Sequence, residues 1–158
     1  MEKSMADEQQ PQGPQLAIQK IYVKDLSYEA PNTPAIFTEE IQPQVDLQMH
    51  NEAKSLDDKT HEIVLTITVT VKLEDKTVYL VEVKQAGIFH LSGFTEEQLS
   101  HVGGTTCPNI LFPYAREAIS DVVIRGGFPP LLLNPVNFDA IYQQEMARKQ
   151  QDTGQKPH

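Results

Sequence analysis

The stretch IVLTITVTVKLEDKTVYLVEVKQAGIF, residues 63–89, alternates apolar and polar side chains with a period of two. One face of the extended chain collects aliphatic residues: Ile63, Leu65, Ile67, Val69, Val71 and Leu73. The other face collects threonines: Thr66, Thr68 and Thr70. Glu74, Asp75 and Lys76 form a turn before the second half of the stretch. The pattern predicts two antiparallel strands joined as a hairpin, in a sheet with one wet side.

Two more strands are expected before this hairpin. Residues 16–28 carry short apolar alternations that slip out of phase, which predicts a strand with β-bulges or strong twist. Ile41, Val45, Leu47 and Met49 alternate with polar residues and predict another strand. Pro43 favours a sheet edge or a bulge for that strand, because proline cannot donate to a ladder of hydrogen bonds.

Helical signals follow the strands. Thr95 and Gln98 have the spacing of a capping box, and the glycines and proline within residues 103–108 are expected to interrupt or bend the helix that follows. A cleaner helix is expected from about Pro113 to Arg125, ended by two glycines. Its apolar stripe is Leu111, Ala115, Ala118, Ile119, Val122 and Val123. Four strands followed by two helices predict an α+β fold with an antiparallel sheet.

The segment GGFPPLLLNPVNFD, residues 126–139, has too many glycines and prolines for a long helix. Consecutive residues of an extended chain point in different directions, so Leu131, Leu132 and Leu133 cannot all face one core. Two interpretations stay open: the segment packs down with one side merely exposed, or that side lines an apolar groove or interface. Asn137 is expected to cap a last helix with Phe138, Ile141, Tyr142 and Met146 on one side.

Length, tails and charge set the class of protein. The 158 residues predict one domain over 16–146, between polar tails at 1–15 and 147–158 that we expect to be disordered. A net charge of −9 argues against nucleic acid and anionic membranes and favours basic partners. The N-terminus lacks the apolar run of a signal peptide, and no apolar run reaches membrane-spanning length. A soluble cytoplasmic protein is expected.

Residues that could carry chemistry are few. His101 and Cys107 lack a third metal ligand in sequence, and a lone cysteine is usually a small core residue. Asp57 and Asp58 lie among polar residues before a strand and indicate a solvated loop. The Gly-Gly-Thr-Thr run at 103–106 lacks the lysine and spacing of a phosphate-binding loop. We expect no enzyme, no metal site and no cofactor.

Three segments carry a resemblance to a known family: IYVKDLSYEAPNTP (21–34), VYLVEVKQAGIF (78–89) and CPNILFPYAREAISDVVIRGGFPPLLLNPVNFDAIY (107–142). The chain resembles the protein-export chaperone SecB over about residues 16–146. The resemblance implies four antiparallel strands and two helices joined by an extended crossover loop, assembled as a dimer of dimers. It also implies an ATP-independent chaperone that holds secretory precursors unfolded in the cytoplasm and delivers them to the export ATPase SecA.

Site residues follow from the same resemblance. The positions that match those implicated in SecA binding are Asp25, Glu29, Leu80 and Glu82. The carboxylates among them fit the predicted wet face and a basic partner. The crossover loop, the last helix and the second strand would build the client groove, for which we expect Tyr28, Ile41, Val45, Leu132, Val136 and Phe138. Some relatives carry a tryptophan in the second-strand region, where this chain has Ile41.

Two alternatives remain. A SecB-like chaperone dedicated to a toxin–antitoxin pair would share the fold, and retained SecA binding would favour export instead. An enzyme or small-ligand protein on the same fold would need a closed pocket with converging polar groups, which nothing in the sequence predicts.

Overall fold

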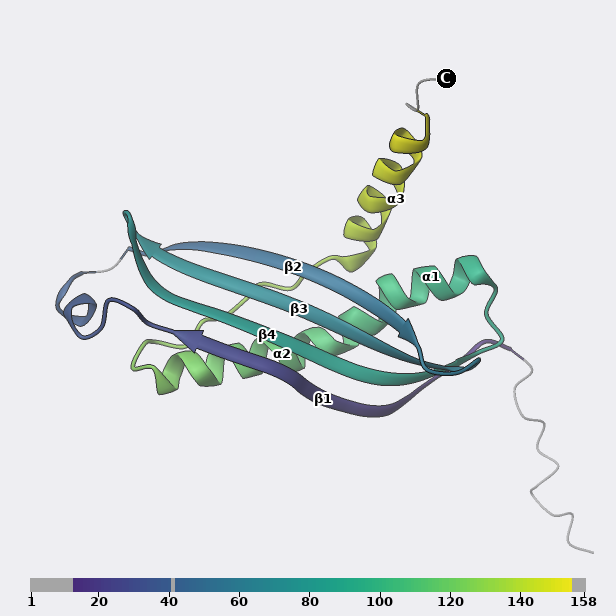
Figure 1. Ribbon diagram of the computed structural model, residues 1–158, viewed down its shortest axis with the longest axis horizontal. Helices are drawn as coiled ribbons and strands as arrows, with labels where there is room; N and C mark the ends of the chain where they lie inside the picture. Colours follow the sequence, from purple (N-terminus) through teal and green to yellow (C-terminus); the bar gives the residue numbers. More distant parts are fainter. Residues whose placement is uncertain (1–12, 41, 155–158) are drawn as a thin grey trace, which may run out of the picture.

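Four antiparallel strands form one sheet in the computed structural model, which describes residues 13–40 and 42–154. They are β1 (Gln15–Glu29), β2 (Gln44–Ser55), β3 (Thr60–Leu73) and β4 (Lys76–Ser92). Their order in the sheet is β1-β4-β3-β2 (Figure 1). The predicted hairpin is β3–β4, and the predicted second strand, β2, lies at an edge. The four strands and the hairpin are therefore confirmed, although β2 begins only at Gln44, after Pro43.

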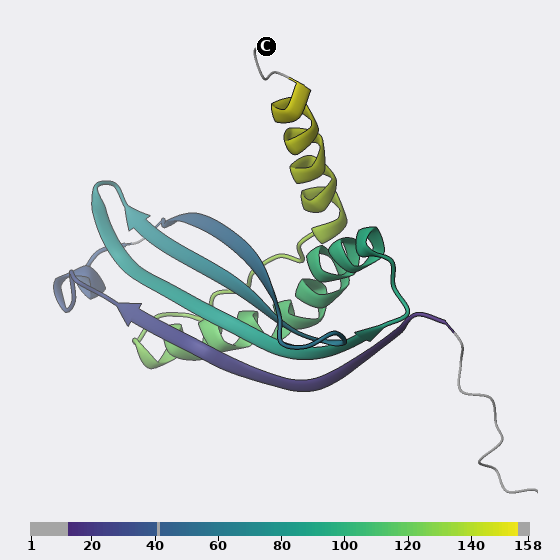
Figure 2. The ribbon, with the colours of Figure 1, turned by 45° about the vertical axis from the view of Figure 1, so that its right-hand side comes forward.

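The predicted bulges lie in β1. Its pairing with β4 shifts register between Ile18 and Lys20 and again between Val23 and Asp25. Each bulge adds one residue to β1 without a counterpart on β4, which increases twist and re-aims side chains. Figure 2 shows β1 curving along its length beside β4. The slips between apolar pairs in residues 16–28 thus have a direct structural cause.

Within the described residues, three α-helices follow the sheet in sequence: α1 (Glu96–Gly104), α2 (Thr106–Arg125) and α3 (Phe138–Gly154). A short 3-10 helix (Ala35–Thr38) follows β1. α2 lies along one face of β4 and β3 (Figures 1 and 2). Its buried stripe packs into the core through Leu111, Ala115, Ile119 and Val123. Gly87 permits this close approach, because a Cβ there would lie 3.0 Å from Leu111 and 2.7 Å from Phe89.

The helix boundaries differ from the prediction at α2. The capping box of Thr95 and Gln98 is present and begins α1 as expected. However, α2 begins at Thr106, so Pro113 lies inside the helix and not at its start. A proline in a helix interior removes one hydrogen bond, but the turn before it is fixed by buried Cys107, Leu111 and Phe112. Packing of that turn outweighs the local signal of the proline.

The last helix begins as predicted and ends later. The side chain of Asn137 accepts a hydrogen bond from the backbone N–H of Ala140 at 3.0 Å. α3 continues to Gly154, so the expectation of a disordered tail from residue 147 is wrong as far as that residue. Most residues from 147 onward are polar, but most of them are also good helix formers. Composition alone does not distinguish such a polar helix from a disordered tail. Residues 1–12 and 155–158 of the expected tails lie outside the described residues.

Candidate functional site

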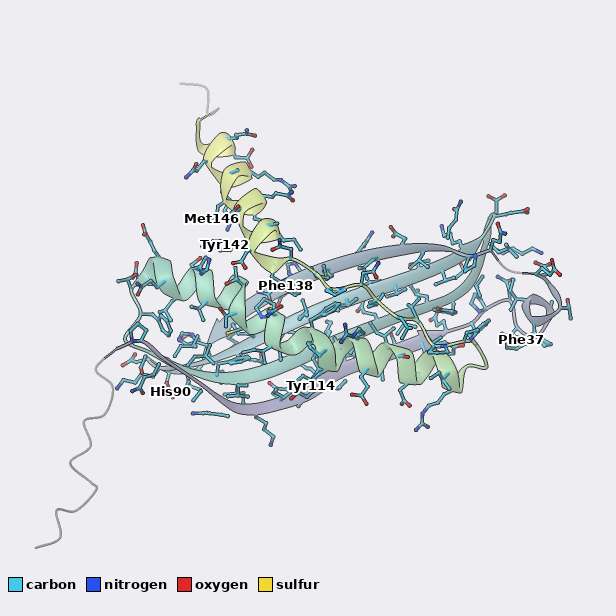
Figure 3. All side chains as sticks on the ribbon, turned by 180° about the vertical axis from the view of Figure 1, so that it is seen from behind. Phe37, His90, Tyr114, Phe138, Tyr142 and Met146 are labelled. Carbon is cyan, nitrogen blue, oxygen red and sulfur yellow. The ribbon has the colours of Figure 1, made fainter. Side chains whose placement is uncertain are left out.

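An apolar hollow of about 250 Å³ lies between the sheet and the segment that joins α2 to α3. Figure 3 shows this crossover segment returning beside α2 over the sheet. The hollow is lined by Pro43, Val71, Val78, Tyr79, Phe128, Pro129, Pro130 and Leu131. The crossover segment therefore leaves apolar space beneath it that the core does not fill.

The three consecutive leucines point in different directions, as predicted. Leu133 is buried in the core, Leu131 is half-buried and lines the hollow, and Leu132 is 80% exposed. The segment is thus sealed on one side only. An exposed leucine beside an apolar hollow extends the surface that an apolar partner can bury.

The edge strand β2 adds to this surface. α2 packs against β4 and β3, while Val45 and Leu47 of β2 remain 48% and 38% exposed. Val45 is paired with Val71, and directly opposed residues of an antiparallel pair share a face. Because Val71 lines the hollow, the apolar surface continues from the hollow onto β2. We call the hollow together with Val45 and Leu47 the crossover groove.

Aromatic rings gather at one end of this groove. Phe128 lies 5.0 Å from Phe37 and 5.1 Å from Tyr79, between ring centroids, and Tyr79 lies 6.4 Å from Tyr28. Burial raises the pKa of both Tyr28 and Tyr79. Phe37 is about half exposed at the far end of the sheet (Figure 3). This cluster gives the groove an aromatic end, at which the ring of Phe37 is accessible to a partner.

The predicted groove residues are divided by the structure. Val45 lies in the crossover groove, Tyr28 in its aromatic end, and Leu132 points outward beside it. Val136 lines a second hollow of about 480 Å³ next to α1 and α2. Phe138 is only 5% exposed and packs against Phe112, so its ring anchors α3 and does not offer a free surface (Figure 3). Ile41 lies outside the described residues.

Other groove residues were not named individually, although the crossover loop as a whole was expected to build the groove. They are Pro43, Leu47, Val71, Val78, Tyr79, Phe128, Pro129, Pro130 and Leu131, with Phe37 at the aromatic end. The alternation of β3 and β4 marks Val71 and Tyr79 as inward-facing, but inward-facing core and groove residues have the same pattern. Only the path of the crossover segment separates them, and that path depends on tertiary packing.

The four predicted SecA-binding residues lie together on the opposite face of the sheet. Glu29 is paired with Leu80, Asp25 is paired with Lys84, and Glu82 is two residues from Leu80 on β4. Residues paired directly or two apart on a strand share a face. The intervening Val81 and Val83 are buried on the α2 side, so the four residues face away from α2. We call Asp25, Glu29, Leu80 and Glu82 the docking face.

Glu82 and Leu80 are half-buried, whereas Asp25 and Glu29 are exposed. The Glu82 carboxylate accepts a hydrogen bond from the Thr68 hydroxyl at 2.9 Å. This bond fixes one oxygen and leaves the other for a partner. The docking face thus offers three carboxylates around one leucine, which suits a basic segment with an apolar residue.

A polar cluster lies beside the docking face. The Tyr22 hydroxyl donates a hydrogen bond to Glu62, and the Lys24 ammonium lies 3.0 Å from the same carboxylate. The bond from Tyr22 and the charge of Lys24 hold the pKa of Glu62 below its ordinary value. Burial and Glu62 raise the pKa of Tyr22 to about 12. Tyr22 and Glu62 belong to β1 and β3, so their bond crosses over β4.

Replacing Tyr22 by Phe is expected to destabilise the fold and to reduce its acid sensitivity. At pH 7 the lost hydrogen bond costs about 0.5–1 kcal/mol of unfolding free energy, because the phenol is partly exposed. Glu62 has a lowered pKa when folded, so its contribution is present above its ordinary value of 4.5 and lost as pH falls through the folded value. Urea unfolding at pH 7 and pH 3 should show the difference between variant and parent shrinking in acid. An equal difference at both pH values would contradict this assignment.

The residues considered for catalysis have other roles. Cys107 is fully buried, and burial raises the pKa of its thiol to about 12, so it is not a nucleophile at neutral pH. His101 contacts Asp139 and the ring of Tyr142. Asp57 accepts hydrogen bonds from the backbone of Lys59 and Thr60 in a turn, as a loop residue does. Within 13–40 and 42–154, no three His, Cys, Asp or Glu residues gather as metal ligands.

Among the residues that the structure describes, none of the helices has the length and apolar character needed to cross a bilayer.

Comparisons with known proteins agree on one family. The model of the preprotein translocase subunit SecB matches residues 8–149. The protein-export protein SecB of Methylococcus capsulatus is 53% identical over 93% of this chain and 95% of its own length. That of Nitrosococcus oceani is 56% identical over 90% of this chain and 88% of its own. That of Methylobacillus flagellatus is 51% identical over 98% of this chain and all of its own.

A solved structure supports the fold. The SecB-like chaperone of Mycobacterium tuberculosis, in complex with a peptide from the HigA1 antitoxin, superimposes with a TM-score of 0.65 at 21% identity. The match covers 77% of this chain and 91% of that one. The sheet order, the crossover segment and these matches together lead to one conclusion: the chain belongs to the SecB family of protein-export proteins.

Proposed function

We propose that this protein is an ATP-independent chaperone that binds unfolded secretory precursors in the cytoplasm, keeps them translocation-competent and delivers them to SecA. The observation that carries the proposal is the separation of two surfaces. The crossover groove lies on the α2 side of the sheet, and the docking face lies on the other side. A precursor and SecA can therefore bind at the same time, as delivery requires.

The crossover groove suits a holding activity. Burying one leucine or phenylalanine side chain of a client stabilises a complex by roughly 1.5–3 kcal/mol. Several such contacts along an extended client offset the cost of ordering it. The contacts are non-directional, so many sequences can use them. Because only the unfolded client binds, folding is slowed by mass action, and slow-folding precursors are held most effectively.

The docking face suits a basic partner. Its carboxylates lie at the surface, where charge steers association and discriminates between partners more than it adds affinity. Leu80, half-buried between them, supplies apolar contact. Replacement of its carboxylates by amides is therefore expected to affect SecA binding and to leave client holding intact.

We propose a homotetramer, a dimer of dimers, as the working assembly. Two features support it: β1 and β2 have open edges in a single chain, and apolar residues are exposed on the flank of β1 and α2. These residues include Val23, Leu26, Tyr114 and Ile124. Four chains at −9 carry −36 formally, which keeps an assembly with apolar grooves soluble, and four grooves bind one client with avidity.

A function in protein export is favoured over a chaperone function dedicated to a toxin–antitoxin pair. The relatives that are 50–56% identical over most of the chain are named protein-export proteins. The toxin–antitoxin chaperone is 21% identical, which supports the fold alone.

Size-exclusion chromatography with light scattering tests the proposal. Four chains of 17.8 kDa give about 71 kDa for the free protein. An unfolded precursor is expected to add the mass of one client chain to that assembly. The same precursor, folded beforehand, is the control and should elute separately. A free protein of single-chain mass, or no complex with the unfolded precursor, would contradict the proposal.

A further inference from the structure

A β-bulge places a lysine next to a docking carboxylate. The register shift between Val23 and Asp25 leaves Lys24 without a counterpart on β4. Asp25 faces the docking side, and the Lys24 ammonium reaches Glu62 on that same side. Lys24 and Asp25 are therefore neighbours both in sequence and on one face of the sheet. A lysine in this position is able to neutralise the carboxylate beside it.

The structure shows a different pairing. The Lys24 ammonium lies 3.0 Å and 3.3 Å from the two oxygens of Glu62. Among the described residues, no ion pair joins Asp25 to Lys24, nor to Lys84, which is its cross-strand neighbour. The Asp25 carboxylate is thus left open to solvent.

Glu62 is held in place for this pairing. Its side chain is only 13% exposed, and it accepts the Tyr22 hydroxyl as well as the lysine. Two donors from β1 therefore meet one carboxylate of β3. With its pKa below the ordinary value, Glu62 also stays charged at neutral pH.

We propose that Glu62 is a positioning residue for partner docking: it holds the Lys24 ammonium away from Asp25 and so keeps that carboxylate available to a basic partner segment. The inference rests on the proposed function of the docking face. Glu62 itself lies outside that face and acts through Lys24. When the Glu62 carboxylate is removed, the nearest carboxylate to Lys24 along the chain is that of Asp25. An ion pair between Lys24 and Asp25 then competes with the basic partner segment for the Asp25 carboxylate.

Calorimetric titration of purified SecA into the full-length protein tests the inference. Glu62→Gln is expected to weaken SecA binding by about fivefold, the upper range for one exposed ion pair. Adding Lys24→Met to Glu62→Gln is expected to restore binding, because the competing ammonium is gone. Adding Lys54→Met instead restores the same net charge but leaves Lys24 free, so binding should stay weak. Lys54 is the direct cross-strand neighbour of Glu62 and makes a close control.

The outcomes separate the inference from the proposed function. Equal rescue by Lys24→Met and Lys54→Met would overturn the inference, since net charge would then explain the loss. No loss with Glu62→Gln, while Asp25→Asn weakens binding, would also overturn it but leave the docking face intact. No loss with Asp25→Asn would remove the docking assignment itself. Rescue by Lys24→Met alone is the result that supports positioning, because a merely structural role of Glu62 would not be repaired by a second substitution.

Discussion

Replacing Asp25 by Asn together with Glu82 by Gln is expected to weaken SecA binding by at least about tenfold and to leave precursor binding unchanged. Both carboxylates lie on the docking face, on neighbouring strands, and neither lies on the side of the crossover groove. The substitutions remove two negative charges without changing side-chain volume. Titration of SecA, and separately of an unfolded precursor, measures the two effects.

A variant with the same change in charge serves as the control. Asp58→Asn with Glu97→Gln alters two exposed carboxylates, one in the turn before β3 and one on α1. The variant with these two substitutions is expected to bind SecA almost as tightly as the parent does. Any difference in affinity should come only from weaker long-range attraction. If the docking variant and the control variant lost affinity for SecA equally, SecA would be responding to net charge and not to these two positions. If the docking pair lost precursor binding as well, the two surfaces would not be independent.

Replacing Val45 by Thr together with Leu132 by Asn is expected to weaken binding of an unfolded precursor by about tenfold to a hundredfold. Both side chains are exposed in the folded chain, so their loss costs the fold little. A bound client would bury them, and the polar replacements forfeit that gain. The substitutions leave the net charge unchanged, so electrostatic attraction of basic clients is preserved. The affinity for the unfolded precursor measures the effect. Thermal unfolding of the variant and the parent shows whether the fold itself is unchanged.

Leu56→Asn provides the matched control for the groove variant. Leu56 is as exposed as Val45 but lies in the loop between β2 and β3, away from the crossover segment. Precursor affinity should stay near the parent value. An equal loss from Leu56→Asn would mean that clients bind any exposed apolar residue and that the crossover groove has no special role.

The sheet and its register-shifted first strand could be predicted because one buried face imposes a period of two. The alternation at 63–73 predicted the hairpin, and the slips within 16–28 predicted bulges or strong twist, of which the structure has two bulges. The helix boundaries were harder to predict from the sequence. The turn from Thr106 to Phe112 is helical because Cys107, Leu111 and Phe112 are buried, and no local signal reports that packing.

The candidate site divides in the same way. Asp25, Glu29, Leu80 and Glu82 share a face because strand geometry places them there, so the period of two was enough to predict that these four positions lie together. The groove residues depend on where the crossover segment runs. Phe138 has the same apolar character as Leu131, yet one anchors α3 against Phe112 and the other lines the hollow. Glu62 could not be singled out from the sequence because its proposed role depends on contacts with β1 that the sequence does not reveal.

The central claim is that apolar surface left open by the crossover segment holds chains that have not yet folded. Refolding of a slow-folding precursor, diluted from denaturant with an equimolar amount of assembled protein and no ATP, tests it most directly. We expect recovery of the native precursor to be delayed, and the delay to be largely lost with the Val45→Thr, Leu132→Asn variant. Refolding at the unassisted rate in the presence of the parent protein would contradict it.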